Sequence, residues 1–281
     1  PPIPVTSVFG RTGAVALTSS DVTGALGYTP YNAASATAKL DKTGGTMTGS
    51  DKLIVGHNQA TGALTQSGGT VTTANEVYIG NENSASSIGT YTLSGSANLN
   101  VGNEVQVGRD NGTGTFNLNG GTVNANKISG GSGSATVNFN GGLLKAKVNE
   151  SNLIENLDVA NVQSGGIKID SDGFNVSTSQ VLTGTGGLEK SGAGQLTLSG
   201  ANTYSGVTTI STGTLVVPGS LSDSTALTIA SGATYGVDAT DTVGSIAGAG
   251  SITTTSAGAK TLTVGYNNGT TSYTGLLSDG S

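Results

Sequence analysis

Short motifs recur along the chain at a nearly regular spacing, and this repetition limits the possible folds more than any other feature. Three copies of one motif are GTYTLSG at 89–95, GTFNLNG at 114–120 and ATVNFNG at 135–141. Leu93, Leu118 and Phe139 occupy the same place in these copies. Such a spacing is typical of solenoids, in which repeats of about 20 to 45 residues pack only against their neighbours.

Within each repeat, apolar and polar residues alternate over four to six positions, as expected for a strand with one buried face. Tyr91 and Leu93 should point inward, while Thr92 and Ser94 should face outward, because side chains alternate along a strand. In the next copy, Phe116 and Leu118 should point inward, while Asn117 and Asn119 should face outward. The chain is therefore predicted to be all-β, a right-handed parallel β-helix of nine or ten coils.

The composition agrees with narrow, closely stacked coils. Glycine contributes 47 of 281 residues, and Gly, Thr, Ser and Asn together contribute 145, whereas glycine alone usually makes up about 7%. Disorder is the rival explanation for such a chain, but the short alternating runs of Val, Ile, Leu and Tyr favour ordered strands. Collagen is excluded, since glycine has no three-residue period and there are five prolines.

Charge and cysteine content exclude further classes. The formal net charge is −6 and no basic cluster occurs, so nothing suggests a nucleic-acid partner. No apolar run approaches the length of about 18 residues that a membrane-spanning helix needs, so no membrane insertion is expected. There are no cysteines, so disulfides do not stabilise the fold.

The first 50 residues differ from the rest. They contain too few apolar residues to bury a core within one chain, so we expect a short, largely extended attachment and trimerisation segment over 1–50, and the β-helix over 51–281. The alanine-rich stretch Asn32–Leu40 is expected to form about two helical turns. Because no atypical capping coil is visible before Ser281, the chain is expected to continue beyond it.

The second half has a different repeat motif and is expected to keep the same period. Its clearest stretch is GGLEKSGAGQLTLSGANTYSGVTTISTGTLVV at 186–217. This stretch resembles the autotransporter-associated β-strand repeat, also called the passenger-associated transport repeat. The resemblance implies an elongated β-helical surface structure.

The N-terminal segment resembles bacteriophage tail fibres through three motifs: VTSVFGRTGAV at 5–15, ALGYTP at 25–30 and GGTMTG at 44–49. This resemblance implies a homotrimer joined to tail or baseplate proteins at one end and bound to a host surface glycan or protein at the other. The residues assigned to tail attachment are Val5, Val8, Phe9, Arg11, Leu26, Tyr28 and Pro30.

The two resemblances lead to three hypotheses. The first is a structural virion protein, a phage tail fibre or spike that projects host-recognition parts for adsorption. The alternative is a bacterial autotransporter-type adhesin at the cell surface. The second alternative is a tailspike that degrades polysaccharide with a pair of carboxylates.

Candidate sites for chemistry are few, and no catalytic, metal or cofactor site is expected. Asp170 and Asp172 precede a glycine as in calcium loops, but Ser179 stands where such a loop needs a glutamate, so a plain Asx turn is expected. Glu76 and Glu104 occupy equivalent repeat positions and are expected to stack on a solvated face. His57, the single histidine, is expected at the surface of the first coil.

Overall fold

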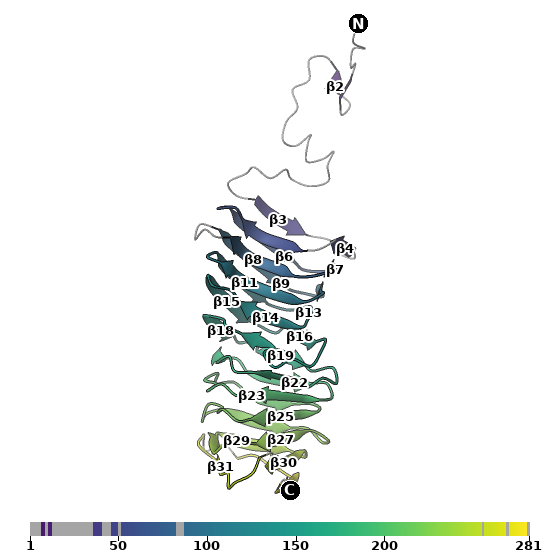
Figure 1. The fold of residues 1–281 in the computed structure, drawn as a ribbon. Helices are drawn as coiled ribbons and strands as arrows, with labels where there is room; N and C mark the ends of the chain where they lie inside the picture. The colour runs from purple at the N-terminus through teal and green to yellow at the C-terminus, as the bar shows by residue number, and fades with distance from the viewer. Residues whose placement is uncertain are drawn as a thin grey trace. The chain divides into compact units, whose positions relative to one another are not determined.

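The computed structural model describes residues 52–82, 87–254, 256–267 and 270–279, together with the strands at 7–8, 11–12, 36–40 and 46–49. Among these residues every regular element is a β-strand. Contacts divide the chain into Pro1–Ala36 and Thr37–Ser281. The larger unit is a stack of coils that wind around a shared interior (Figure 1), which confirms the all-β, parallel β-helical fold.

Four sheets run along this stack, one strand per coil, and we name them faces 1 to 4. Face 1 contains β3 (Ala36–Leu40), β6 (Thr61–Gln66), β9 (Ile88–Leu93), β12 (Thr113–Leu118), β15 (Ser134–Phe139), β18 (Val159–Val162) and β21 (Thr183–Gly184). Face 2 contains β4 (Thr46–Gly49), β7 (Thr70–Thr73), β10 (Asn98–Val101), β13 (Thr122–Ala125), β16 (Leu143–Ala146), β19 (Ile167–Asp170), β22 (Leu188–Ser191), β24 (Thr208–Ile210), β26 (Ala226–Ile229) and β29 (Ser245–Gly248). The ten strands of face 2 correspond to the predicted nine or ten coils.

The other two faces follow one another along the stack. Face 3 contains β5 (Leu53–His57), β8 (Val77–Glu82), β11 (Glu104–Asp110), β14 (Lys127–Gly130) and β17 (Ile154–Glu155). Face 4 contains β20 (Val176–Thr178), β23 (Gln195–Leu198), β25 (Thr214–Val217), β27 (Thr234–Val237), β30 (Ser251–Thr254) and β32 (Leu276–Ser278). Two further pairs are β28 (Asp241–Val243) with β31 (Leu262–Val264), and β1 (Ser7–Val8) antiparallel to β2 (Arg11–Thr12).

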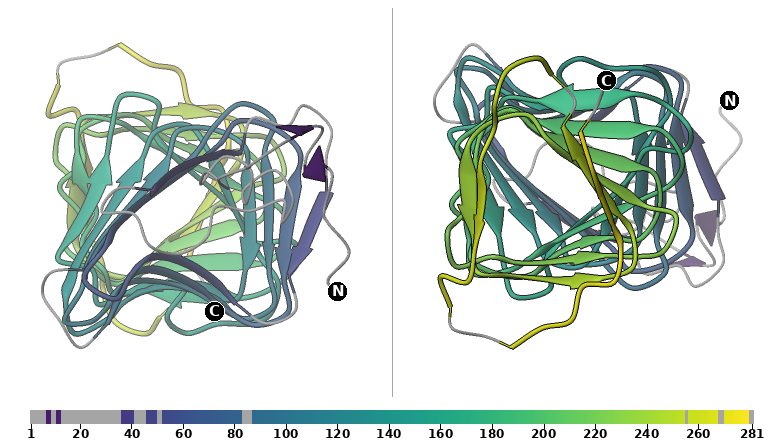
Figure 2. Two further views of the ribbon diagram at one scale, coloured as in Figure 1. Left: turned by 90° about the horizontal axis from the view of Figure 1, so that it is seen from above. Right: turned by 90° about the horizontal axis from the view of Figure 1, so that it is seen from below.

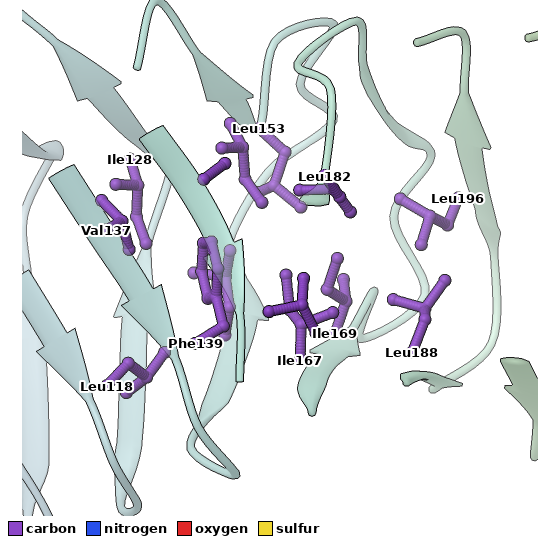
Figure 3. Close-up of a cluster of buried hydrophobic side chains, with 14 of the residues drawn as sticks. Leu118, Ile128, Val137, Phe139, Leu153, Ile167, Ile169, Leu182, Leu188 and Leu196 are labelled. Carbon is purple, nitrogen blue, oxygen red and sulfur yellow. The ribbon is translucent and has the colours of Figure 1, made fainter. Parts of the chain in front are cut away.

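The register places equivalent repeat residues directly above one another. Phe116 pairs with Tyr91 and with Val137, and Leu118 pairs with Leu93 and with Phe139. All of these side chains are fully buried, as their alternation predicts. Figure 2 views the stack from its two ends, and Figure 3 shows Phe139, Leu153, Ile169 and Leu196 contributing to one apolar interior.

Glycine ladders let the coils turn sharply where face 3 meets face 1. Gly80 has a φ of +70°, in the left-handed region that glycine adopts most readily. A Cβ on its neighbour Gly89 would lie 2.1 Å from the carbonyl oxygen of Val55 and 2.2 Å from the amide nitrogen of Gly80. Any other residue at this position would place its Cβ too close to these backbone atoms. This explains why glycine recurs at these repeat positions.

Three sequence expectations differ from the structure. Ala36–Leu40 forms strand β3 rather than a helix, because β6 supplies hydrogen-bonding partners for its backbone. The rest of that expected helix lies outside the described residues. Strands β3 and β4 also belong to faces 1 and 2, so the compact unit starts before the boundary drawn at residue 50.

The third difference is the repeat length, which does not stay constant. Asn98 pairs with Thr70 in the preceding coil, whereas Thr209 pairs with Glu189, which is considerably nearer to it in the sequence. Coils up to β17 carry strands on faces 1, 2 and 3, while coils after β21 carry strands mainly on faces 2 and 4. Irregular segments replace one strand in the later coils, which shortens each repeat.

Candidate functional surfaces

The predicted tail-attachment residues fall mostly outside the described residues. Val8 and Arg11 are opposite each other in the antiparallel pair β1–β2. The remaining five, Val5, Phe9, Leu26, Tyr28 and Pro30, lie outside the described part of the chain. The attachment role of this set therefore stays a prediction.

Glu76 and Glu104 do occupy equivalent positions, because Val77 and Val105, the residues that follow them, are in register. Each glutamate faces cationic or hydroxyl groups. Lys52 Nζ lies 3.6 Å from Glu76, and Ser129 Oγ donates a 2.8 Å hydrogen bond to Glu104. The two carboxylates are thus held in side-chain contacts along face 3.

Lys127 connects two carboxylates on the same face. Its Nζ lies 2.6 Å from Glu155 and 3.7 Å from Glu104. The hydrogen bond with Glu155 raises the pKa of Lys127 above its usual value. An ammonium between two carboxylates is attracted to both, so this cluster forms ion pairs between successive coils.

Tyr78 is an outward-facing aromatic residue on face 3 that is nevertheless buried. The Arg109 guanidinium lies 4.2 Å from its ring centroid and Lys52 Nζ lies 5.1 Å from it. Both distances are within the range of cation–π contacts. The side chains of three successive coils therefore stack here as one layer.

Asp170 and Asp172 form the expected Asx turn. The amide of Asp172 donates a 2.8 Å hydrogen bond to Asp170 Oδ1, and Lys145 Nζ lies 2.9 Å from Asp172 and 3.9 Å from Asp170. The lysine ammonium supplies the positive charge near both carboxylates. Among the described residues no group of three or more His, Cys, Asp or Glu side chains is arranged to hold a metal ion.

His57 lies half-buried on β5, beside Asn81 of the next coil. Its Nδ1 lies 3.1 Å from the Asn81 carbonyl oxygen and 3.2 Å from Asn81 Nδ2. The pairing of His57 with Asn81 follows the strand register. This contact stabilises adjacent coils.

Asparagine side chains form a ladder on the solvent side of face 1. Asn161 donates to Asn138 at 3.1 Å, Asn138 donates to Asn117 at 2.8 Å, and Asn117 donates to Thr92 at 3.2 Å. Stacked identical amides in register form such ladders in parallel sheets. The repeat explains these rows, because Asn117, Asn138 and Asn161 occupy the same repeat position.

Lys190 is a buried lysine that sequence reasoning did not single out. It stands between Ile169 and Ile210 in the register of face 2 and is fully buried. Its Nζ donates to the carbonyl oxygens of Ser191 at 2.7 Å, Gly192 at 2.8 Å and Thr212 at 3.2 Å. The alternation of LEKS, with lysine at an inward position, is the signal that could have revealed it.

Asn202 and Tyr204 explain why the motif SGANTYSG suits this fold. Asn202 is buried; its Oδ1 accepts from the Leu182 amide at 3.0 Å, and its Nδ2 donates to the carbonyl oxygens of Gly200 and Ser220. Tyr204 is also fully buried, and its hydroxyl lies 2.8 Å from Thr208 Oγ1. One amide thereby connects backbone groups of three coils beside the isolated bridge between Ala201 and Ser220.

Comparisons with known proteins agree with this structural reading. Residues 188–217, which span β22 to β25, match the family described as Passenger-associated-transport-repeat. Searches of curated proteins and of solved structures find no match. Within the described residues, no helix is long and apolar enough to cross a membrane.

Replacing Asn202 by alanine should lower the free energy of unfolding by about 2 kcal/mol, because the buried Leu182 amide loses its acceptor and the carbonyl oxygens of Gly200 and Ser220 each lose one of two donors. Urea denaturation measures the change. Asn124→Ala is the matched control: Asn124 donates one 2.8 Å hydrogen bond to Asn100 on the partly exposed side of face 2, so its loss should cost under about 1 kcal/mol. Equal losses in the two variants would contradict the role assigned to Asn202.

Lys190 predicts a specific pH dependence of stability. Burial lowers the pKa of Lys190 to about 8, from 10.5, so between these values the unfolded chain binds more protons than the folded chain. The free energy of unfolding should therefore rise with pH in this window. Between pH 8 and 9.5 the rise should amount to roughly 1 to 2 kcal/mol.

Lys190→Met is the comparison, since it keeps an unbranched side chain and removes the titrating group. Its overall stability should fall, because three carbonyl oxygens lose the hydrogen bond from the lysine ammonium, and the rise between pH 8 and 9.5 should disappear. Urea denaturation at several pH values measures both effects. Identical pH profiles for the two proteins would refute the assignment.

Proposed function

We propose that this chain is the shaft of an elongated bacterial surface protein of the autotransporter-passenger type. The match of residues 188–217 to the passenger-associated repeat is the observation that carries the proposal. Those residues are continuous with the rest of the stack, since β22 pairs with β19 before it and with β24 after it. The passenger-like repeat is thus part of one solenoid.

The structure suits a mechanical role. Ten strands in face 2, spaced at about 4.8 Å per coil, give a rod roughly 45 Å long. Each coil contacts its neighbours through backbone ladders, which makes the rod stiff along its axis. Such a rod holds whatever is attached to it at a fixed distance from its anchor, and several copies strengthen weak contacts by avidity.

A second candidate is the shaft of a phage tail fibre. The observation that favours it is the resemblance of the motifs at 5–15, 25–30 and 44–49 to tail-fibre proteins. In this reading three copies assemble as a homotrimer, the N-terminal segment joins tail or baseplate proteins, and the distal end meets a host glycan or protein. None of the described contacts favours the polysaccharide-degrading alternative.

Fractionation of the source culture separates the two candidates. An antibody against the purified chain should label the envelope of intact cells, and the antigen should sediment with outer membranes. Copurification of the antigen with tailed particles, and its absence from washed cells, would overturn the passenger proposal in favour of the tail fibre. A deletion strain processed in parallel is the control for antibody specificity.

A further inference from the structure

The corner between faces 1 and 2 carries glycines in several successive coils. Glycines occupy the turn in each coil, and Gly121 shows why: its φ is +68°, and a Cβ there would lie 2.4 Å from the carbonyl oxygen of Ala97. Gly166 has a φ of +78° at the equivalent turn farther along. A row of such turns leaves a trough along the edge of the stack.

Two open grooves of about 580 and 190 Å³ lie in this trough. The first extends from the turn at Gly95, and the second reaches Val207. Both are lined by Lys168 and Glu189, so they meet at this pair. About five coil steps of roughly 4.8 Å separate the two ends, which gives a trough about 24 Å long. This length fits a linear polymer better than a compact small molecule.

Lys168 and Glu189 are neighbours in the strand register, yet they form no ion pair. Among the lysines whose side chains the structure describes, Lys168 alone makes no hydrogen bond or ion pair. Glu189 accepts one long hydrogen bond, 3.3 Å, from Ser211 Oγ. An ammonium with three donors and a carboxylate with spare acceptor sites therefore stand side by side where the two grooves meet.

The polar groups that line the trough indicate which class of linear polymer it can bind. Ser96, Thr122 and Thr209 add hydroxyl groups to the walls, and hydroxyls act as both donors and acceptors. A polyanion is disfavoured, because the trough presents one cation beside a carboxylate on a chain of net charge −6. Adjacent sugar hydroxyls match a carboxylate acceptor next to an ammonium donor.

We propose that the trough between faces 1 and 2 binds a linear, neutral polysaccharide, with Lys168 and Glu189 hydrogen-bonded to its hydroxyl groups. This binding involves no bond cleavage. It does not depend on whether the shaft belongs to a cell surface or to a phage tail, so its failure would leave the proposed function untouched.

Affinity electrophoresis of the full chain in gels containing a linear glucan, mannan or galactan tests the proposal. At least one of these should retard the protein. Lys168→Met and Glu189→Gln should each raise the dissociation constant at least tenfold, because each removes a charged hydrogen-bonding partner of the sugar. Ser96→Tyr, at an exposed turn residue, should also reduce retardation by filling the first groove.

Lys260→Met is the matched control, since Lys260 lies outside the trough and its Nζ contacts the carbonyl oxygen of Ala257 at 3.2 Å; its retardation should equal that of the unaltered chain. Circular dichroism checks that each variant is folded. Absence of retardation by all three neutral polymers would overturn the proposal, as would retardation only by a uronate-containing polymer. Retardation unchanged in the three trough variants would place the site elsewhere.

Discussion

The structure depends on one constraint, the parallel in-register stacking of each coil on the one before it. In a parallel ladder the same repeat position recurs at every step along the axis. Phe116 therefore lies over Tyr91, and Asn138 over Asn117. Interior packing, corner glycines and surface amide ladders are all consequences of this single alignment.

The same constraint decides which residues are tolerated. A corner glycine such as Gly89 faces the backbone of the adjacent coil at a distance that excludes any Cβ. Inward positions must hold apolar side chains, or polar side chains whose hydrogen-bonding groups have partners. Lys190 meets this requirement because its ammonium donates to three carbonyl oxygens. Outward positions meet solvent, and there the chain carries Thr, Asn and the few charged groups that give each surface its chemistry.

The sequence was sufficient to predict the solenoid, the inward side chains such as Tyr91 and the Asx turn at Asp170, because local alternation and turn residues encode them. It did not predict that Ala36–Leu40 is a strand, since that segment gains its ladder only by pairing with β6. Nor did it show that the repeat shortens, because the irregular segments that replace one strand in the later coils carry no strand pattern of their own. The trough at Lys168 was also missed, because glycine turns reveal a groove only once the coils are stacked.

The most direct test of this account is disulfide trapping of the register, which the absence of native cysteines makes simple. Thr115 pairs with Thr136 on the outer side of face 1, so Thr115→Cys combined with Thr136→Cys should form an intramolecular disulfide under mild oxidation. Thr115→Cys combined with Val137→Cys should not, since Val137 points into the core. Efficient trapping of the second pair, or failure of the first, would contradict the stacked register on which every inference above rests.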